Sequence, residues 1–152
     1  MSKANAVAEA LKAMLAMISQ TNGFATDAGA FVYRGKIVGQ EEVNAPCVTL
    51  FEDEATVLSQ KEKTVAVRVP YVAEASGPCD ADNPNVMGQT LASDVCRALW
   101  PETPNTTLND LLMDDTGLAY AGHQILPRPP GQASVTVQVK FNATFVFNLS
   151  HP

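Results

Sequence analysis

The residues that could carry acid–base, nucleophilic or metal chemistry are few in this sequence and lie far apart. There are two histidines, His123 and His151, and three cysteines, Cys47, Cys79 and Cys96. Neither histidine has a cysteine or a carboxylate at the spacing of metal ligands, and no Cys-x-x-Cys pair occurs. The odd number of cysteines at long spacings favours reduced thiols, so we expect no metal site and no disulfide.

One nucleophilic arrangement stays open, because Cys96 and His123 could meet in space as a catalytic pair. Cys96 lies beside the apolar stripe of a predicted helix, however, and a cysteine in such a place usually packs as a small apolar residue. The sequence contains no phosphate-binding glycine loop, no dinucleotide-binding fingerprint and no Gly-x-Ser-x-Gly nucleophile elbow. We therefore expect no enzymatic activity, no catalytic residues and no cofactor.

Carboxylates gather in four short segments that are rich in turn-forming residues. These segments contain Glu41 and Glu42; Glu52, Asp53 and Glu54; Asp80 and Asp82; and Asp114 and Asp115. None has the regular spacing of a calcium loop, so the simplest interpretation is a solvated acidic rim. The alternative is a surface that repels the phosphates of a DNA duplex passing nearby. The net charge of −6 argues against a protein that reads DNA sequence, since such proteins usually carry a basic patch.

Length and composition indicate a single folded domain over residues 1–152. The chain is 46% apolar and 17% charged, which is ordinary for a globular protein and too apolar for disorder. No apolar run reaches the length that crosses a membrane. In the opening stretch, Glu9, Lys12 and Gln20 interrupt the apolar residues at regular intervals, which favours a helix over an export signal.

Two main helices are predicted to position the rest of the chain, over residues 3–21 and 85–100. The first has a single apolar stripe, formed by Val7, Leu11, Met14, Leu15 and Ile18. The second ends before Pro101, and its apolar face is formed by Leu91, Ala92, Val95, Ala98 and Leu99. Each helix should bury one face against another layer of the protein.

Strands are predicted near residues 31–37, 47–51, 65–71 and 117–126, before a long strand that closes the chain. Pro70 cannot donate a ladder hydrogen bond, which places its strand at an edge or a bulge of the sheet. The charged segment 52–63 is predicted to be a long hairpin connection. Strands divided by a helix favour an α+β fold, with a mostly antiparallel sheet and both main helices packed on one face.

The closing strand, residues 134–150, alternates apolar and polar side chains along almost its whole length. The odd positions, which include Phe141, Phe145 and Phe147, are apolar from Val135 to Leu149. A strand of that length spans about 50 Å, whereas a domain of this size is about 40 Å across. The strand must therefore bend, or part of its apolar face must project and meet something outside the domain, which points toward assembly.

The order of these elements resembles that of one group of viral proteins. A short amphipathic helix is followed by "NGFATDAGAFVYRG", "APCVTLFED" and an alternating strand, then by the helix "LASDVCRALWP" and the segment "GLAYAGHQILPRPPGQASVTVQVKFNATFVFNLSHP". This pattern looks like the tail terminator proteins (tail completion or minor tail proteins) of long-tailed bacteriophages. The region "PETPNTTLNDLL" departs from it, because related proteins often carry a glycine-rich step there.

The resemblance implies a structural protein of the virion tail that assembles in the host cytoplasm. Members form a ring, typically of six subunits, that caps the tail tube, stops its polymerisation and presents a surface to the head-side connector or neck protein. DNA passes through the hole without specific binding, and in contractile tails related proteins also meet the sheath protein. Two alternatives stay open: another head–tail joining or tail-tube component or a secretion-system analogue, and a small enzymatic or ligand-binding α+β domain.

An assembly interface can be assigned to two segments as a hypothesis. The connection 52–63 is longer than a tight hairpin needs, carries both signs of charge and holds an apolar pair that a solvated loop would not need. The closing strand offers large apolar side chains. The expected interface residues are Glu52, Asp53, Glu54, Val57, Leu58, Lys61, Lys63, Phe141, Phe145 and Phe147.

Overall fold

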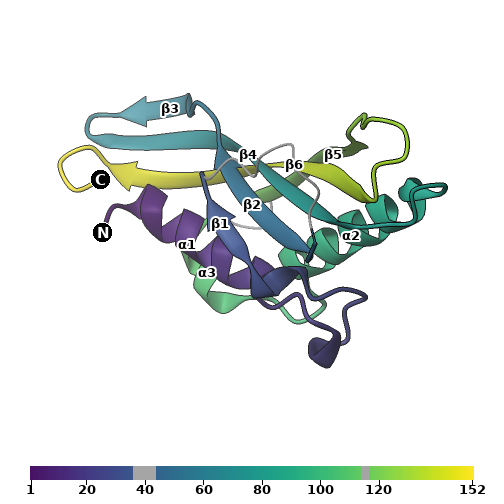
Figure 1. Ribbon diagram of the computed structural model, residues 1–152. Helices are drawn as coiled ribbons and strands as arrows, with labels where there is room; N and C mark the ends of the chain where they lie inside the picture. Colours follow the sequence, from purple (N-terminus) through teal and green to yellow (C-terminus); the bar gives the residue numbers. More distant parts are fainter. Residues whose placement is uncertain (36–43, 114–116) are drawn as a thin grey trace.

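The computed structural model of the chain describes residues 1–35, 44–113 and 117–152 (Figure 1). Its elements are, in chain order, α1 (Lys3–Leu15), the 3-10 turns η1 (Gln20–Asn22) and η2 (Ala28–Ala30), β1 (Val32–Arg34), β2 (Cys47–Glu52), β3 (Thr56–Lys61), β4 (Thr64–Pro78), α2 (Pro84–Leu99), α3 (Thr106–Leu111), β5 (Leu118–Ile125) and β6 (Ser134–Asn148). The predicted strand 31–37 is seen as β1 up to Arg34, and its end lies outside the described residues.

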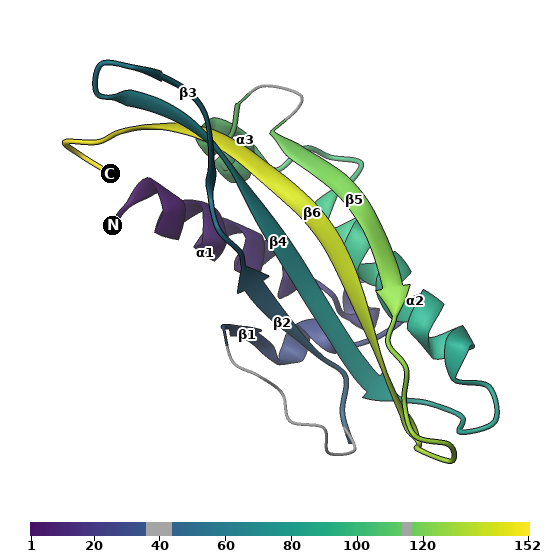
Figure 2. The same cartoon turned by 90° about the horizontal axis from the view of Figure 1, so that it is seen from above.

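The strands form one sheet in the order β1-β2-β4-β6-β5, and β3 pairs with β4 beyond the end of β2. Among the described strands, β1 and β2 run parallel and the other pairs are antiparallel. The helices α1, α2 and α3 lie on one face of this sheet, and within the described residues the opposite face carries no helix (Figures 1 and 2). The predicted α+β fold, with its main helices on one face, is confirmed.

The centre of the sheet is a long ladder between β4 and β6, each of 15 residues. It runs without interruption from the pair Thr64–Asn148 to the pair Pro78–Ser134. The odd positions of β6 from Val135 to Phe145 are buried beneath the helices, as their alternation predicts. Phe147 is only half-buried, and Leu149 beyond the strand is 50% exposed. The long strand therefore keeps most of its apolar face within its own domain.

The core joins this ladder to the two main helices. The apolar stripes predicted for both helices are buried, including Leu11, Leu15, Leu91 and Val95 at 0% exposure. On the sheet, the ring of Tyr71 stacks on Phe141 at 5.5 Å between centroids. Since burying a large apolar side chain contributes about 1.5–3 kcal/mol, these stripes are what hold the helices on one face.

The strand that contains Pro70 lies in the middle of the sheet and pairs with β6 without a register shift at that residue, so its prediction as an edge strand or a bulged strand was wrong. The backbone N–H of Asp53 donates to the carbonyl of Pro70 at 2.9 Å, so the missing N–H of Pro70 faces the same side. On that side β2 has ended and β3 has not begun. Proline is tolerated in this central strand because it lies opposite the gap between two neighbours.

The first helix is shorter than predicted, since α1 ends at Leu15 rather than near residue 21. Ser19 starts the separate turn η1 by accepting a hydrogen bond from the Asn22 N–H at 3.2 Å. Ile18 stays fully buried, so the apolar stripe continues through a segment that is no longer helical. The second main helix matches its prediction within one residue at each end.

Candidate assembly surface

The charged segment 52–63 is not a plain connection, because it contains the strand β3. β3 forms a hairpin with β4 through a two-residue turn at Glu62 and Lys63. All six residues of β3 are exposed, and within the described chain β3 pairs on one side only. The hairpin lies at the same end of the sheet as both chain termini (Figures 1 and 2). It therefore presents an open strand edge at one end of the molecule.

Two apolar side chains of β3 lie at this open edge. Val57 is 60% exposed and Leu58 is 44% exposed, at a bulge between Val57 and Ser59. Val57 is opposite Val67 in the ladder, which is 4% exposed and belongs to the helix-covered face. Val57 thus continues the apolar, helix-covered face of the sheet onto β3, where its side chain is exposed. Leu58 is the extra residue of the bulge.

The charges of the hairpin point into solvent. Glu54, Lys61, Glu62 and Lys63 are all exposed. Within the described chain both ion pairs belong to Arg34, so none of these four charges has a salt-bridge partner there. Exposed, unpaired charges of both signs keep an open edge soluble and leave it able to pair with a neighbour.

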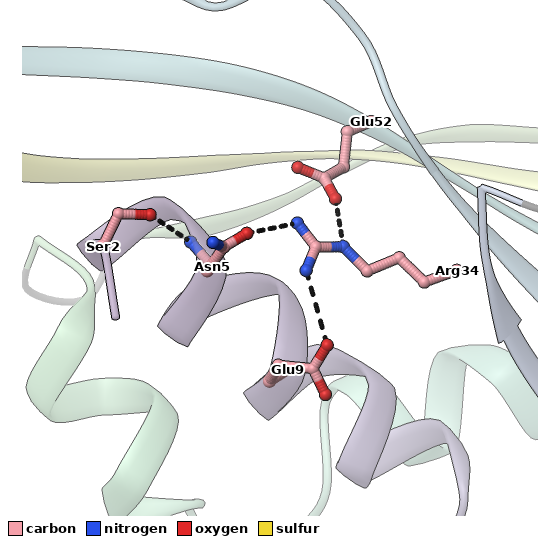
Figure 3. A network of polar contacts seen from close by, with 5 residues as sticks. All are labelled: Ser2, Asn5, Glu9, Arg34 and Glu52. Carbon is pink, nitrogen blue, oxygen red and sulfur yellow. Dashed lines mark hydrogen bonds and ion pairs between the residues drawn. The ribbon is translucent and has the colours of Figure 1, made fainter.

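Glu52 and Asp53 have roles inside the chain. Arg34 of β1 donates through Nε to Glu52, through Nη1 to Glu9 at 3.4 Å and through Nη2 to Asn5 at 2.9 Å (Figure 3). The hydrogen bond to Glu52 raises the pKa of Arg34. This network ties α1 to the strands β1 and β2. Asp53 accepts from the N–H of Glu54 at 2.7 Å, which shapes the bend before β3.

Two of the three phenylalanines predicted for the interface lie in the hydrophobic core instead. Phe141 and Phe145 are each 1% exposed, so neither can meet a partner without unfolding the domain. Phe147 is half-buried near the hairpin end. Alternation along β6 marks a buried face, but it cannot distinguish burial in the same chain from burial against a neighbour. Of the ten predicted residues, Glu54, Val57, Leu58, Lys61 and Lys63 form the open hairpin surface.

A second open edge, which sequence reasoning missed, lies at the other side of the sheet. β5 pairs with β6 and, in the described chain, with no other strand. Tyr120 on this strand is 50% exposed; its hydroxyl lies 2.5 Å from His123 Nδ1, and His123 Nε2 lies 3.1 Å from Gln89 Oε1 on α2. The signal for this edge was the uncharged run "GLAYAGHQIL", which lacks the charges that usually guard an edge strand.

An apolar hollow accompanies the β5 edge. Its volume is about 400 Å³, and Cys96, Arg97, Trp100 and Tyr120 line it. Trp100 packs edge-on against Tyr120 at 6.0 Å between ring centroids, and its Nε1–H donates to the Leu118 carbonyl at 3.3 Å. α2 emerges from beneath β5 on the side away from β6 (Figure 2). The hollow therefore lies beside the open edge of β5, between this strand and α2.

The candidate chemical groups are not brought together. The hydrogen-bond partners of His123 are Tyr120 and Gln89, and Cys96 lies about two turns further along α2. Burial raises the pKa of the Cys96 thiol, which disfavours the nucleophilic thiolate. No disulfide joins Cys47, Cys79 or Cys96 to another described residue. Among the described residues, no group of three or more His, Cys, Asp or Glu side chains could hold a metal ion.

A second hollow, of about 390 Å³, lies between α1 and the segment that joins α2 to α3. It is lined by Met14, Leu99, Trp100, Pro101, Pro104, Asn105, Leu108, Asn109, Leu112 and Leu118. None of these described lining residues has a titratable side chain, so they offer no group for acid–base work. No helix in the described part of the chain is long and apolar enough to span a membrane.

The acidic clusters divide between described and undescribed segments. Asp80 and Asp82 lie in the bend before α2, where Asp80 accepts from the N–H of Asp82 at 2.9 Å. Glu41, Glu42, Asp114 and Asp115 lie outside the described residues. The expected acidic surface is therefore described only at the hairpin and before α2.

The chain matches no protein-family model, and no curated protein matches it significantly.

Proposed function

We propose that this chain is a tail terminator of a long-tailed bacteriophage. In this role it forms a ring, with six subunits as the expected number, on the end of the tail tube. The ring stops tube polymerisation and offers its free face to the head-side connector or neck protein. DNA passes through the hole without being bound, and a contractile tail would add the sheath protein as a partner. The protein is then a structural component, found in the virion tail and, during assembly, in the host cytoplasm.

The observation that carries this proposal is the open β3 edge with its exposed apolar pair. A six-residue strand that is exposed throughout and unpaired on one side is a template for another chain. Proteins that stay monomeric usually cover such an edge or keep it short. Here Val57 and Leu58 remain exposed beside it, which supports a protein whose folded subunit is built to be completed by a neighbour.

Two further features support the same role. The element order resembles that of the terminator group over nearly the whole chain. The described sheet is also open on both sides, at β1 and β3 on one side and at β5 on the other, as a ring subunit needs, because each subunit in a ring contacts its two neighbours through different surfaces.

The test compares tails assembled with and without this chain. Tube protein that polymerises alone should give tubes of uncontrolled length that fail to join heads. Adding the purified chain should restore a single length, measured by negative-stain electron microscopy, with a ring visible at one end. Tails of normal length that form in the complete absence of the chain would refute the proposal.

A further inference from the structure

We infer that neighbouring copies of this chain join by antiparallel pairing of β3 of one copy with β5 of the next, with Val57 and Leu58 seated against the hollow beside β5. This inference deepens the proposed function. That the contacts close into a ring rests on the proposed terminator role. The occupant of each open edge is thus a second copy of the same chain. Four observations carry it, and they concern strand direction, stagger, apolar contact and charge.

The strand directions fit without rearrangement. β4 is antiparallel to both β3 and β6, and β6 is antiparallel to β5, so β3 and β5 run in opposite directions. A second copy placed beside β5 in the same orientation presents its β3 antiparallel to that strand. Both edges use unpaired backbone groups, so their ladder would form by β-augmentation. Because the two edges differ and lie on opposite sides of the sheet, the contact is head-to-tail and can repeat around a ring.

The stagger between the two edges also fits a closed ring. β3 is level with residues 144–148 of β6, through the pairs Thr56–Arg68–Thr144 and Lys61–Thr64–Asn148. β5 is level with residues 137–143. The centres of the two edges therefore differ by about six residues, or roughly 20 Å, while one repeat of four strands, with the spacing to the next copy included, is roughly 19 Å wide. Such an offset inclines the strands by roughly 45° to the ring axis, near the 35–45° found in closed sheets.

Apolar side chains meet on the helix-covered face. Val57 belongs to that face through its partner Val67, and Tyr120 belongs to it through its partner Phe141. α2 projects past the β5 edge, so a strand added there would lie over α2 and over the hollow of about 400 Å³ (Figure 2). The 60% exposed Val57 and the 44% exposed Leu58 are the side chains available to fill it.

The charges near the two edges also favour a second copy of the chain as the partner. Arg97 lines the hollow. Glu54, two residues before β3, is exposed and has no ion-pair partner within the described chain. Opposite charges at the rim of a contact favour the correct encounter more than they add affinity, so Glu54 and Arg97 would select orientation while the apolar pair provides most of the binding.

The first experiment separates the two faces of β3. Val57→Asp should abolish self-association of the concentrated full-length protein, measured by size-exclusion chromatography with light scattering. Ser59→Asp, its matched control on the other face of the same strand, should assemble like the wild type. Both positions are exposed in the subunit, so the melting temperatures of the monomers should stay within a few degrees of wild type. Equal assembly of the two variants would overturn the inference.

The second experiment tests the open backbone edge. The turn at Glu62 and Lys63 makes Lys61 and Thr64 the hydrogen-bonded closing pair, so the N–H of Gln60 points away from β4. Gln60→Pro removes that N–H and should lower assembly at least tenfold, whereas Gln60→Ala keeps it and should assemble normally. If both variants assemble equally while circular dichroism shows them folded, the pairing is wrong.

Crosslinking identifies the partner edge and remains decisive if a variant folds poorly. In a chain with Cys47 and Cys79 replaced by alanine, Val57→Cys and the native Cys96 should be joined by a short bis-maleimide into species larger than a dimer. Replacing Cys96 by alanine should remove every crosslinked band. Dimers that persist without Cys96 would reveal a two-fold β3–β3 contact and overturn the inference, and so would the absence of any crosslink.

The outcomes separate this inference from the proposed function. Rings that crosslink as described but leave tube length uncontrolled would refute the terminator role and keep the β3–β5 contact. Rings that cap tubes without the Val57–Cys96 crosslink would keep the role and refute the contact.

Discussion

The carboxylate of Asp94 in α2 accepts hydrogen bonds from both the backbone N–H and the hydroxyl of Thr26, at 2.9 and 2.7 Å. It also accepts from the N–H of Ala25 at 3.1 Å. Asp94 is 2% exposed and Thr26 is 7% exposed, so the carboxylate fastens the segment after α1 to the second main helix.

Asp94→Asn should destabilise the fold, because the amide replaces one accepting oxygen by a donor and leaves buried donors unpaired. We expect a loss of about 2–4 kcal/mol in the free energy of unfolding, measured by urea denaturation. Asp110→Asn, an exposed aspartate in α3, is the control and should change stability by less than about 0.5 kcal/mol. Similar losses in the two variants would show that the carboxylate's hydrogen bonds contribute little.

Tyr71→Phe should stabilise the protein or leave it unchanged. The Tyr71 hydroxyl is buried and has no hydrogen-bond partner in the described structure, so removing it removes an unsatisfied polar group. Tyr120→Phe is the exposed control. A loss of more than about 1 kcal/mol in the Tyr71 variant, by the same denaturation assay, would reveal a partner such as a bound water.

Alkaline pH supplies a second readout at Tyr71. Burial raises the pKa of its hydroxyl, so the folded state holds this proton more strongly than the unfolded chain does. This tighter proton binding stabilises the folded state relative to the same protein at very alkaline pH. The effect is complete below the unfolded pKa of about 10 and declines as the pH rises above that value. Wild type should therefore lose stability between about pH 10 and 11 more steeply than Tyr71→Phe. Parallel curves for the two proteins would contradict the assignment.

Phe145→Asp should impair folding far more than Thr144→Asp. Phe145 is 1% exposed beneath the helices, whereas the neighbouring Thr144 is only partly buried and its side chain points to the opposite face of the sheet. Burying an unpaired carboxylate costs several kcal/mol, comparable with the stability of a whole domain. Soluble yield and urea midpoints measure the difference, and equal effects would count against the burial pattern of β6.

Glu62→Gly should stabilise the β3–β4 turn. Glu62 has φ of 54°, and it is the non-glycine residue with positive φ among the described residues. That conformation costs a residue with a side chain about 1–2 kcal/mol, and the extra entropy of glycine in the unfolded chain offsets part of the gain. We expect a net gain of about 0.5–1 kcal/mol. Lys63→Gly, at a neighbouring position without positive φ, should give no gain in the same thermal melts.

Much of the fold could be predicted because its main elements are half-buried. The stripe from Val7 to Ile18 and the alternation along β6 each mark one buried face, and burial is what imposes a period. β3 escaped prediction because it is exposed on both faces and so has no apolar period. Its turn at Glu62 and Lys63 also lacks the glycine, asparagine or aspartate that marks most two-residue hairpins.

The candidate site was harder to predict for a related reason. Val57 and Leu58 stood out as an apolar pair in a charged segment, but nothing in that segment shows that they flank an open ladder. The β5 edge depends on which strand is last in the sheet, and that order arises from pairings between residues far apart in the chain, such as Leu118 with Ala143.

The position of Pro70 has a consequence for how the sheet opens. β2 and β3 run in the same direction along one side of β4, and the proline lies opposite the break between them. On this side of β4 the ladders of β2 and β3 are separate, so β3 can detach from β4 as a cooperative unit of its own while β2 and the β4–β6 ladder stay in place. Amide protons of β3 should then exchange with deuterium much sooner than those of β2, and contact with a neighbouring copy should slow them selectively. Because of this break, β3 should be the part of the free subunit whose amide protons are least protected from exchange.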